Sequence, residues 1–256
     1  MDKIGLIGGS MFFGSGFLSN LEGKEVETEY GKVDVLVGEN IVYIQRHGKN
    51  NNIPPHKINH RANIAAFKEL GVNKVIGINS VGSLRSKTKP GAIVIPKDYI
   101  DFGCLTFFDK EIQRIVPELD KELRDGLIKT AKKNKIPVSD WEIYYQAKGP
   151  RLETKAEVNM MKGFAQIVGV AMANEATLAK EMEIKYAAIC SVENYANGII
   201  KKELTNDQIL EQRKKNTEIL KTFVEKIIED SFKKEEKKKE ESSGKIYDFI
   251  KGIRGG

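Results

Sequence analysis

The 256-residue chain is poor in the residues that build disulfide frameworks and metal centres. It contains two cysteines, Cys104 and Cys190, and three histidines, and none of them stands at metal-ligand spacing. Both cysteines lie among apolar residues, so we predict reduced, buried thiols in a cytoplasmic protein. Apolar runs fall well short of the roughly 20 residues of a membrane span. A predicted strand begins at Lys3, so we expect neither a signal peptide nor contact with a membrane.

The chain also lacks a concentrated charge of one sign. It has 42 basic and 36 acidic residues, a net charge of +6. Residues 232–256 hold eight Lys or Arg against five Asp or Glu, and so contribute +3 of that total. The remainder is only mildly basic, and no nucleic-acid partner is predicted. The charge run at 233–241, followed by Ser and Gly, cannot build a core, so we predict one domain over 1–232 and a charged, flexible tail over 233–256.

Three apolar, β-branched runs in the first third of the chain each stop at small or polar residues. The runs cover 3–7, 41–45 and 74–78, and they end at Gly8-Gly9-Ser10, at Arg46-His47-Gly48, and at Asn79-Ser80-Val81-Gly82-Ser83. Such runs are typical of buried parallel strands, and ligands of open α/β sheets bind beyond the carboxyl ends of these strands. Backbone N–H groups at glycines, hydroxyls and an arginine fork all bind anions. Together the three clusters predict a site for one small anion.

Each cluster taken alone has a second interpretation. Gly8-Gly9-Ser10 also fits a plain tight turn, and it lacks the lysine and the spacing of NTPase and dinucleotide loops. Arg46 follows a predicted buried strand directly, and burial of its charge requires an anionic partner, which favours function. His47 is ambiguous, and His56 and His60 fit ordinary polar positions near a helix start.

Two later clusters also follow predicted buried strands. Glu153, in Gly149-Pro150-Arg151-Leu152-Glu153-Thr154, either contacts a ligand or stabilises the start of a helix. Asn194 either binds a ligand or forms an Asx-type turn. Neither a GxSxG elbow nor a Cys–His pattern is present, so we expect the attacking group not to be a side chain.

The remaining pattern alternates strands and helices, which predicts an α/β fold. Further strands are predicted at 33–37, 92–95, 141–146, 167–170 and 187–192, and helices at about 60–70, 117–134, 153–161, 175–182 and 205–232.

Taken together, these motifs resemble the family of trimeric purine nucleoside phosphorylases and methylthioadenosine phosphorylases. The matching stretches lie at 4–10, 46–48, 55–64, 79–84, 149–154, 168–171 and 175–180, in uninterrupted order over residues 3–230. The resemblance implies a three-layer α/β sandwich with a mixed, barrel-like central β-sheet flanked by helices. It also implies a homotrimer or homohexamer, and orthophosphate as co-substrate with no metal and no other cofactor.

The resemblance implies a phosphate site formed by Ser10, Arg46, His47, Asn79, Ser80 and Ala171. Orthophosphate would attack C1′ of a nucleoside to give ribose 1-phosphate and a free base. Val170, implied to contact the ribose, stands where the family usually has Met. Ala171 stands where the family usually has a Ser or Thr that touches phosphate, so this chain departs from the pattern there.

The residues implied to bind the base are Glu153, Asn194, Tyr195 and Ala196, of which Glu153 and Asn194 are implied to be catalytic. Methylthioadenosine enzymes carry Asp-Tyr-Asp where this chain has Asn194-Tyr195-Ala196, whereas 6-oxopurine enzymes carry a Glu in Phe-Glu-Thr and a lone Asn. A carboxylate accepts the N1–H of a 6-oxopurine and repels the N1 lone pair of adenine, and an amide serves O6 and N7. This predicts phosphorolysis of inosine and guanosine in purine salvage.

Two alternatives stay open at this point. The overall likeness to methylthio-nucleoside enzymes, including the Arg46-His47-Gly48 motif, allows an S-methyl-5′-thioinosine or methylthioadenosine phosphorylase. The missing hydroxyl at Ala171 allows a non-catalytic protein that binds nucleosides or, through its basic tail, nucleic acid.

Overall fold

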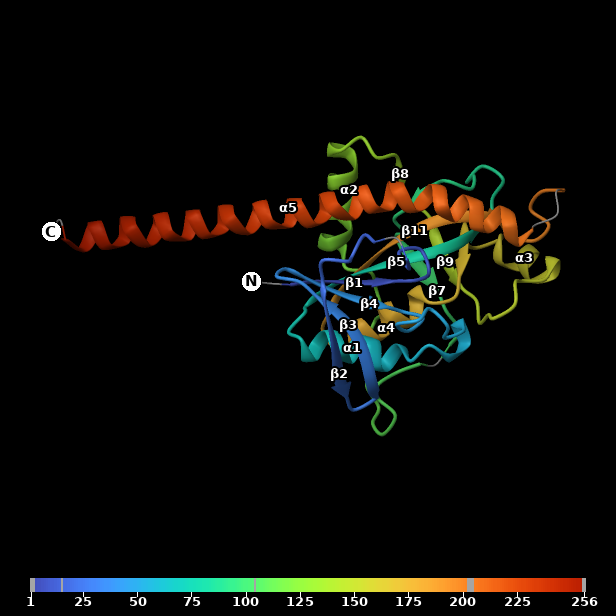
Figure 1. The fold of residues 1–256 in the computed structure, drawn as a ribbon, viewed down its shortest axis with the longest axis horizontal. Helices are drawn as coiled ribbons and strands as arrows, with labels where there is room; N and C mark the ends of the chain where they lie inside the picture. The colour runs from blue at the N-terminus through green and yellow to red at the C-terminus, as the bar shows by residue number, and fades with distance from the viewer. Residues whose placement is uncertain (1–2, 15, 104, 202–204, 255–256) are drawn as a thin grey trace.

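The computed structural model of the chain describes residues 3–14, 16–103, 105–201 and 205–254, with side chains to residue 230. Its centre is a mixed sheet of 11 strands in the order β2-β3-β4-β1-β5-β10-β9-β7, in which β11 pairs with β5 and β6, and β6 with β8 (Figure 1). The strands are β1 (Ile4–Gly8), β2 (Glu22–Thr28), β3 (Gly31–Val37), β4 (Ile41–Gln45), β5 (Lys74–Ser83), β6 (Ile93–Val94), β7 (Asp98–Ile100), β8 (Val138–Ser139), β9 (Ile143–Gln146), β10 (Ile167–Gly169) and β11 (Lys185–Tyr195).

Helices cover both faces of this sheet. On one face α1 (His60–Glu69) and α4 (Met172–Glu181) share a core with alternate residues of the strands, including Ile7 and Cys190. On the other face α2 (Lys121–Lys133) and α5 (Asn206–Arg254) bury apolar residues against Leu6 and Ile189. The short helix α3 (Lys155–Met161) packs on a smaller cluster around Val168. The predicted three-layer α/β architecture is therefore confirmed, but within the described residues the sheet does not close into a barrel.

The three apolar runs noted in the sequence are neighbouring parallel strands. β1 is buried along its whole length and lies between β4 and β5, with Gly8 opposite both Gln45 and Ile78. The strands predicted at 33–37 and 41–45 form a hairpin, because β3 pairs antiparallel with β4. The residues that follow Gly8, Gln45 and Ile78 therefore meet at one edge, as the anion-site prediction requires.

Several predicted boundaries are wrong, for identifiable reasons. β5 does not stop at Ile78, because Asn79 and the residues after it pair with β11 and β10. Helix α2 begins after Asp120 rather than at Pro117, since the Asp120 side chain accepts the N–H of Leu123. Helix α3 begins at Lys155, and α4 at Met172. β2, β7 and β8 have no counterpart among the predicted strands, and α5 continues to Arg254 instead of ending near 232.

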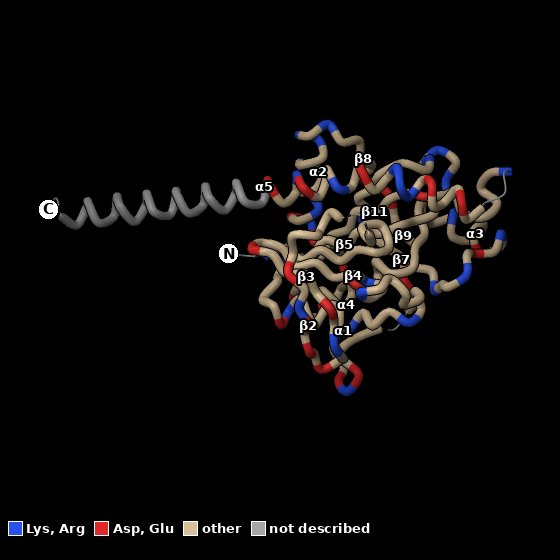
Figure 2. The backbone as a smooth tube through the Cα atoms, in the orientation of Figure 1, with Lys and Arg blue, Asp and Glu red and all other residues tan. Residues whose placement is uncertain are grey.

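Charge and hydropathy of the described residues agree with the composition. Basic and acidic residues are interspersed over the described backbone rather than gathered on one face (Figure 2). Of the described helices, none combines the length and apolar character needed to cross a bilayer. Cys190 is a buried free thiol, and Cys104 lies outside the described residues.

Candidate active site

Arg46 lies beneath the ends of the three parallel strands. It follows β4 directly, its N–H donates to the carbonyl of Gly8 at 2.8 Å, and only 4 % of the residue is exposed. Its guanidinium donates to the carbonyl oxygens of Ile78 (Nη1, 3.0 Å) and Ile7 (Nη2, 3.2 Å). One side chain thus ties β4, β1 and β5 together at the edge where the candidate anion site lies.

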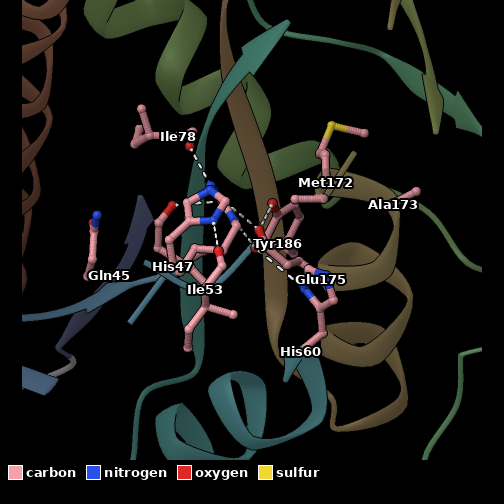
Figure 3. A network of polar contacts seen from close by, with 12 residues as sticks. Gln45, His47, Ile53, His60, Ile78, Met172, Ala173, Glu175 and Tyr186 are labelled. Carbon is pink, nitrogen blue, oxygen red and sulfur yellow. Dashed lines mark hydrogen bonds and ion pairs between the residues drawn. The ribbon is translucent and has the colours of Figure 1, made fainter. Parts of the chain in front are cut away.

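The anionic partner of Arg46 is Glu175, a residue of α4. Nη2 donates to Oε2 at 2.9 Å and Nε donates to Oε1, and the two side chains are 3 % and 0 % exposed. Tyr186 of β11 also donates to Oε2, at 2.8 Å (Figure 3). Burial opposes the charge on Arg46, but the Glu175 carboxylate outweighs it and raises the Arg46 pKa above its usual range. The buried charge that favoured a ligand therefore has a partner inside the protein.

One Arg46 donor remains for a ligand. Of the five guanidinium N–H groups, four are used by Glu175, Ile7 and Ile78, which leaves one on Nη1. A side chain at Gly9 would come within 3.3 Å of that Nη1. The glycine therefore keeps the space above Nη1 open, which is the arrangement an anion-binding loop needs.

His47 lies next to the same loop, and its ring is oriented by the backbone. Nδ1–H donates to the carbonyl of Ile53 at 2.8 Å (Figure 3). A side chain at Gly9 would lie 3.7 Å from the other ring nitrogen, Nε2. Burial lowers the pKa of His47 below its ordinary value, so the imidazole is neutral near pH 7.

Ser10 belongs to a chain of side-chain hydrogen bonds that sequence reasoning missed. Its hydroxyl donates to Asn51 Oδ1 at 3.0 Å, and Gln45 Nε2 donates to the same oxygen at 3.0 Å. Gln45 in turn accepts from the hydroxyl of Tyr43. Asn51 has a φ of 52°, a left-handed conformation that asparagine tolerates better than most residues. An asparagine-rich loop, 50–52, is the one sequence signal for this role.

Asn79 and Ser80 are adjacent on β5 and have different surroundings. Asn79 is 3 % exposed, and its side-chain amide lies beside the Tyr186 hydroxyl. Ser80 instead donates to Glu193 Oε1 at 2.6 Å. Glu193 pairs with Arg213 of α5 at 2.9 Å. Of the two, Asn79 shares the environment of Arg46, and Ser80 belongs to the Glu193–Arg213 pair.

Ala171 ends the chain segment that leads into α4. Its N–H and that of Met172 donate to the hydroxyl of Tyr144 at 3.2 and 3.4 Å, and the Ala173 N–H donates to Gln146 Oε1 at 3.1 Å. The first N–H groups of the helix are thus bound within the protein. Ala171 offers neither a hydroxyl nor a free N–H here, so the departure noted in the sequence leaves this position without a donor for an anion.

The predicted base-binding residues divide between two cavities. Asn194, Tyr195 and Ala196 line a cavity of about 1000 Å³ together with the first turns of α5, whereas Glu153 and Val170 line one of about 500 Å³. The two segments are joined where Asn197 Nδ2 donates to the carbonyl of Glu153 at 3.2 Å. The structure does not place the Glu153 carboxylate and the Asn194 amide in the same cavity.

Each of these two base-site residues has a local feature that bears on its role. Asn194 Nδ2 donates to the backbone carbonyl of Tyr195 at 2.9 Å, a local contact of the kind a turn residue makes. Burial raises the pKa of Glu153 above its usual value. A carboxyl with a raised pKa beside a cavity is a candidate for a group that exchanges or holds a proton.

The described residues contain no cluster of three or more His, Cys, Asp or Glu side chains that could hold a metal ion.

Comparison with known proteins covers nearly the whole chain. Residues 3–229 match the family model described as Phosphorylase superfamily. A probable 6-oxopurine nucleoside phosphorylase of Archaeoglobus fulgidus is 42% identical over 238 residues, covering 90% of this chain and 96% of that protein. A probable S-methyl-5′-thioinosine phosphorylase of Methanocaldococcus jannaschii is 39% identical, covering 89% and 90% of the two chains.

A solved structure extends the likeness to the fold. The methylthioadenosine phosphorylase from Schistosoma mansoni, in complex with adenine, superposes with a TM-score of 0.82 at 25% identity, covering 89% of this chain and 91% of that one. The chain therefore belongs to the phosphorylase superfamily and is an enzyme of the purine nucleoside phosphorylase family, a pentosyltransferase.

Proposed function

We propose that this enzyme cleaves 6-oxopurine nucleosides such as inosine and guanosine with orthophosphate, and that it serves purine salvage. The observation that carries the proposal is that Asn194, near the end of β11, and Ala196, just after it, line the larger cavity without an ionisable side chain at either position. The neighbouring carboxylate, Glu193, is held by Arg213 and Ser80. An amide can donate to O6 or N7 of the purine, whereas carboxylates here would select the amino group of adenine.

In this proposal the phosphate occupies the strand-end cluster of Ser10, Arg46, His47 and Asn79. Its oxygen attacks C1′ as the bond between C1′ and N9 breaks, and the electron pair leaves with the purine. Asn194 stabilises the charge that develops on the departing base, which favours the transition state over the bound substrate. The Glu153 carboxylate accepts N1–H, and it must turn from the smaller cavity toward Asn194 to do so.

The test is a nucleoside panel assayed with and without phosphate. We expect release of free base from inosine and guanosine to require orthophosphate and no added metal, and to exceed release from adenosine. Release that does not depend on phosphate would contradict the proposal. Nucleoside binding without any release would instead support the non-catalytic alternative.

A second substrate class is supported by the relatives. Proteins named S-methyl-5′-thioinosine phosphorylase and 6-oxopurine nucleoside phosphorylase match this chain at similar identity. Including methylthioinosine in the panel separates the two substrate classes, since inosine and methylthioinosine carry the same base and differ at the 5′ position. A kcat/KM for methylthioinosine well above that for inosine would move the assignment to the methylthio class. The homotrimer or homohexamer implied by the resemblance stays a prediction.

A chain that ends at residue 233 is expected to keep its phosphate-dependent activity and its thermal stability. The residues that anchor α5 to the sheet, Leu220, Phe223, Val224 and Ile227, are buried and all precede that point. Turnover of inosine and a thermal melt of the truncated and full chains check this. Loss of turnover with an unchanged melting temperature would show that residues 234–256 contribute to the reaction.

A further inference from the structure

Glu193 is a buried carboxyl residue beside the base cavity that has no role in the reaction as proposed. Its side chain is 2 % exposed, and it lines the cavity of about 1000 Å³ together with Asn194. Consecutive residues of a regular strand point to opposite faces of the sheet. Here the register of β11 against β5 shifts between Val192 and Asn194, so that Glu193 is the extra residue of a β-bulge. A bulge redirects a side chain, and this one lets two consecutive residues line the same cavity.

Two side chains hold the Glu193 carboxylate in place. Ser80 donates to Oε1 at 2.6 Å. Arg213 of α5 donates to Oε2 through Nη2 at 2.9 Å, and its Nε lies 3.1 Å from both carboxylate oxygens. The Arg213 side chain is 27 % exposed, and within the part of the chain that the structure describes its Nη1 donates to no acceptor. The pair therefore offers N–H donors next to carboxylate lone pairs, which suits a hydroxyl, a group that both donates and accepts.

The ion pair of Glu193 and Arg213 lies between the two ends of the proposed substrate site. Arg213 is close enough to His47, in the phosphate cluster, to oppose a proton on its ring. On the other side, Glu193 directly precedes Asn194, the residue proposed to bind the base. The part of a nucleoside that lies between the attacking phosphate and the base is the sugar. The ion pair is therefore placed to contact the sugar.

The stereochemistry of a β-nucleoside indicates which part of the sugar reaches the ion pair. Phosphate attacks C1′ from the face opposite the base, and the 2′ and 3′ hydroxyls lie on that same face. The 5′ carbon instead lies on the face that carries the base. Glu193 lines the base cavity, and residues of α5 on either side of Arg213 line it as well. The 5′ substituent is therefore the part of the sugar that comes nearest to the pair.

We propose that Glu193 and Arg213 bind the 5′-hydroxyl of the nucleoside, the carboxylate accepting its proton and the guanidinium donating to its oxygen. The pair then selects a sugar with a free 5′-hydroxyl over one with a 5′-methylthio group. A thioether has no proton to donate, accepts hydrogen bonds weakly, and would remove water from an ion pair without replacing its hydrogen bonds. The inference rests on the proposed function, because it assumes that phosphate and base bind at their proposed positions.

Nucleosides that differ only in the sugar test the proposal with the unmodified full chain. The measurement is kcat/KM for phosphate-dependent release of hypoxanthine from inosine, 5′-deoxyinosine, 2′-deoxyinosine and methylthioinosine. We expect inosine to exceed both 5′-deoxyinosine and methylthioinosine by about 10- to 100-fold. A site built to hydrogen-bond a hydroxyl rejects an analogue that lacks it, and the partial exposure of Arg213 limits the effect because water can replace the missing group.

A double variant assigns this preference to the ion pair. Glu193→Leu combined with Arg213→Met removes both charges, so that neither is left buried alone. The ratio of kcat/KM for inosine over methylthioinosine should fall at least about tenfold, while the ratio for inosine over 2′-deoxyinosine stays unchanged. Glu211→Leu combined with Lys215→Met is the matched control. It removes an exposed ion pair of the same helix beside the same cavity, and it should leave both ratios unchanged.

If the double variant does not fold, Arg213→Lys keeps a charge opposite Glu193 without the planar fork and should lower the first ratio in part. Turnover of 5′-deoxyinosine or methylthioinosine equal to that of inosine, or above it, overturns the 5′ assignment and leaves phosphorolysis of 6-oxopurine nucleosides intact. A folded double variant with an unchanged ratio of inosine over methylthioinosine overturns it as well. Absence of phosphate-dependent base release from all four nucleosides would instead overturn the proposed function, and this inference with it.

Discussion

Arg46→Met is expected to lower the free energy of unfolding by about 3–5 kcal/mol, because it leaves the Glu175 carboxylate buried without its cation. The same change removes the donor to the Ile78 and Ile7 carbonyls, so the edges of β5 and β1 lose a shared contact. The phosphate concentration needed for half-maximal turnover should rise sharply, since a charge-assisted hydrogen bond contributes about 1.5–3 kcal/mol. Urea denaturation and phosphate-dependent kinetics measure the two effects separately.

A double variant separates folding from binding. Arg46→Met combined with Glu175→Leu removes both charges, and an apolar pair of similar volume is expected to recover most of the lost stability. The double variant should still need a raised phosphate concentration for half-maximal turnover. If Arg46→Met alone lowers the free energy of unfolding by less than about 1 kcal/mol, the result would contradict a stabilising buried ion pair between Arg46 and Glu175. A double variant that saturates normally with phosphate would contradict the role of Arg46 at the site.

Glu153→Gln is expected to reduce the ratio of kcat/KM for inosine over adenosine by about 30- to 150-fold. The variant keeps the shape of the side chain but replaces an acceptor of N1–H with an amide that can donate to N1 of adenine. The magnitude corresponds to about 2–3 kcal/mol for a hydrogen bond to a charged group in a closed site. Steady-state kinetics on both nucleosides at saturating phosphate gives the ratio.

Asn194→Asp is the companion measurement. An ionised carboxylate at this position would face O6 of inosine, so turnover of inosine should fall, while an adenine amino group gains an acceptor. Asn197→Asp, at a neighbouring asparagine whose amide donates to the Glu153 carbonyl, provides the control for an added charge in the same cavity. The base pocket is misassigned if the unmodified enzyme has a ratio of kcat/KM for inosine over adenosine near or below one. The same conclusion follows if Glu153→Gln leaves this ratio unchanged.

The strand-end anion cluster is the part of the site that the sequence predicts best, because apolar strands and the residues that follow them are local patterns. The partner of Arg46 was not predicted, since Glu175 is 129 positions away and its pairing depends on how α4 packs. Asn51 was missed for a related reason, because its role needs a left-handed turn that returns the loop to Ser10. The end of β5 was misplaced because pairing with β11 overrides the break that Asn79 suggests.

The position of Glu153 illustrates a different limit. Its place at a strand-to-helix junction was predicted, and Thr154 does form a capping box with Glu157 at the start of α3. Which cavity the carboxylate enters depends on the conformation of the loop before the helix, which residue types and spacing do not determine. The motif thus identifies the residue, and tertiary contacts determine where its side chain lies.

Among the strands that the structure describes, β5 alone has three partners, since it pairs with β1, with β10 and with β11. The strands β1 and β4, which lead to Ser10 and Arg46, lie to one side of it, and β11, which contains Asn194, pairs with its other side. Along β5 itself, Asn79 lies by the anion cluster, and Gly82 lies where an added side chain would come within 3.3 Å of Asn194 Nδ2. In the proposed reaction, this short stretch of β5 therefore lies between the phosphate cluster and the base cavity. A one-residue slip in its register would reverse the faces of both positions at once, so the proposed phosphate contact and the proposed base contact would be disrupted together.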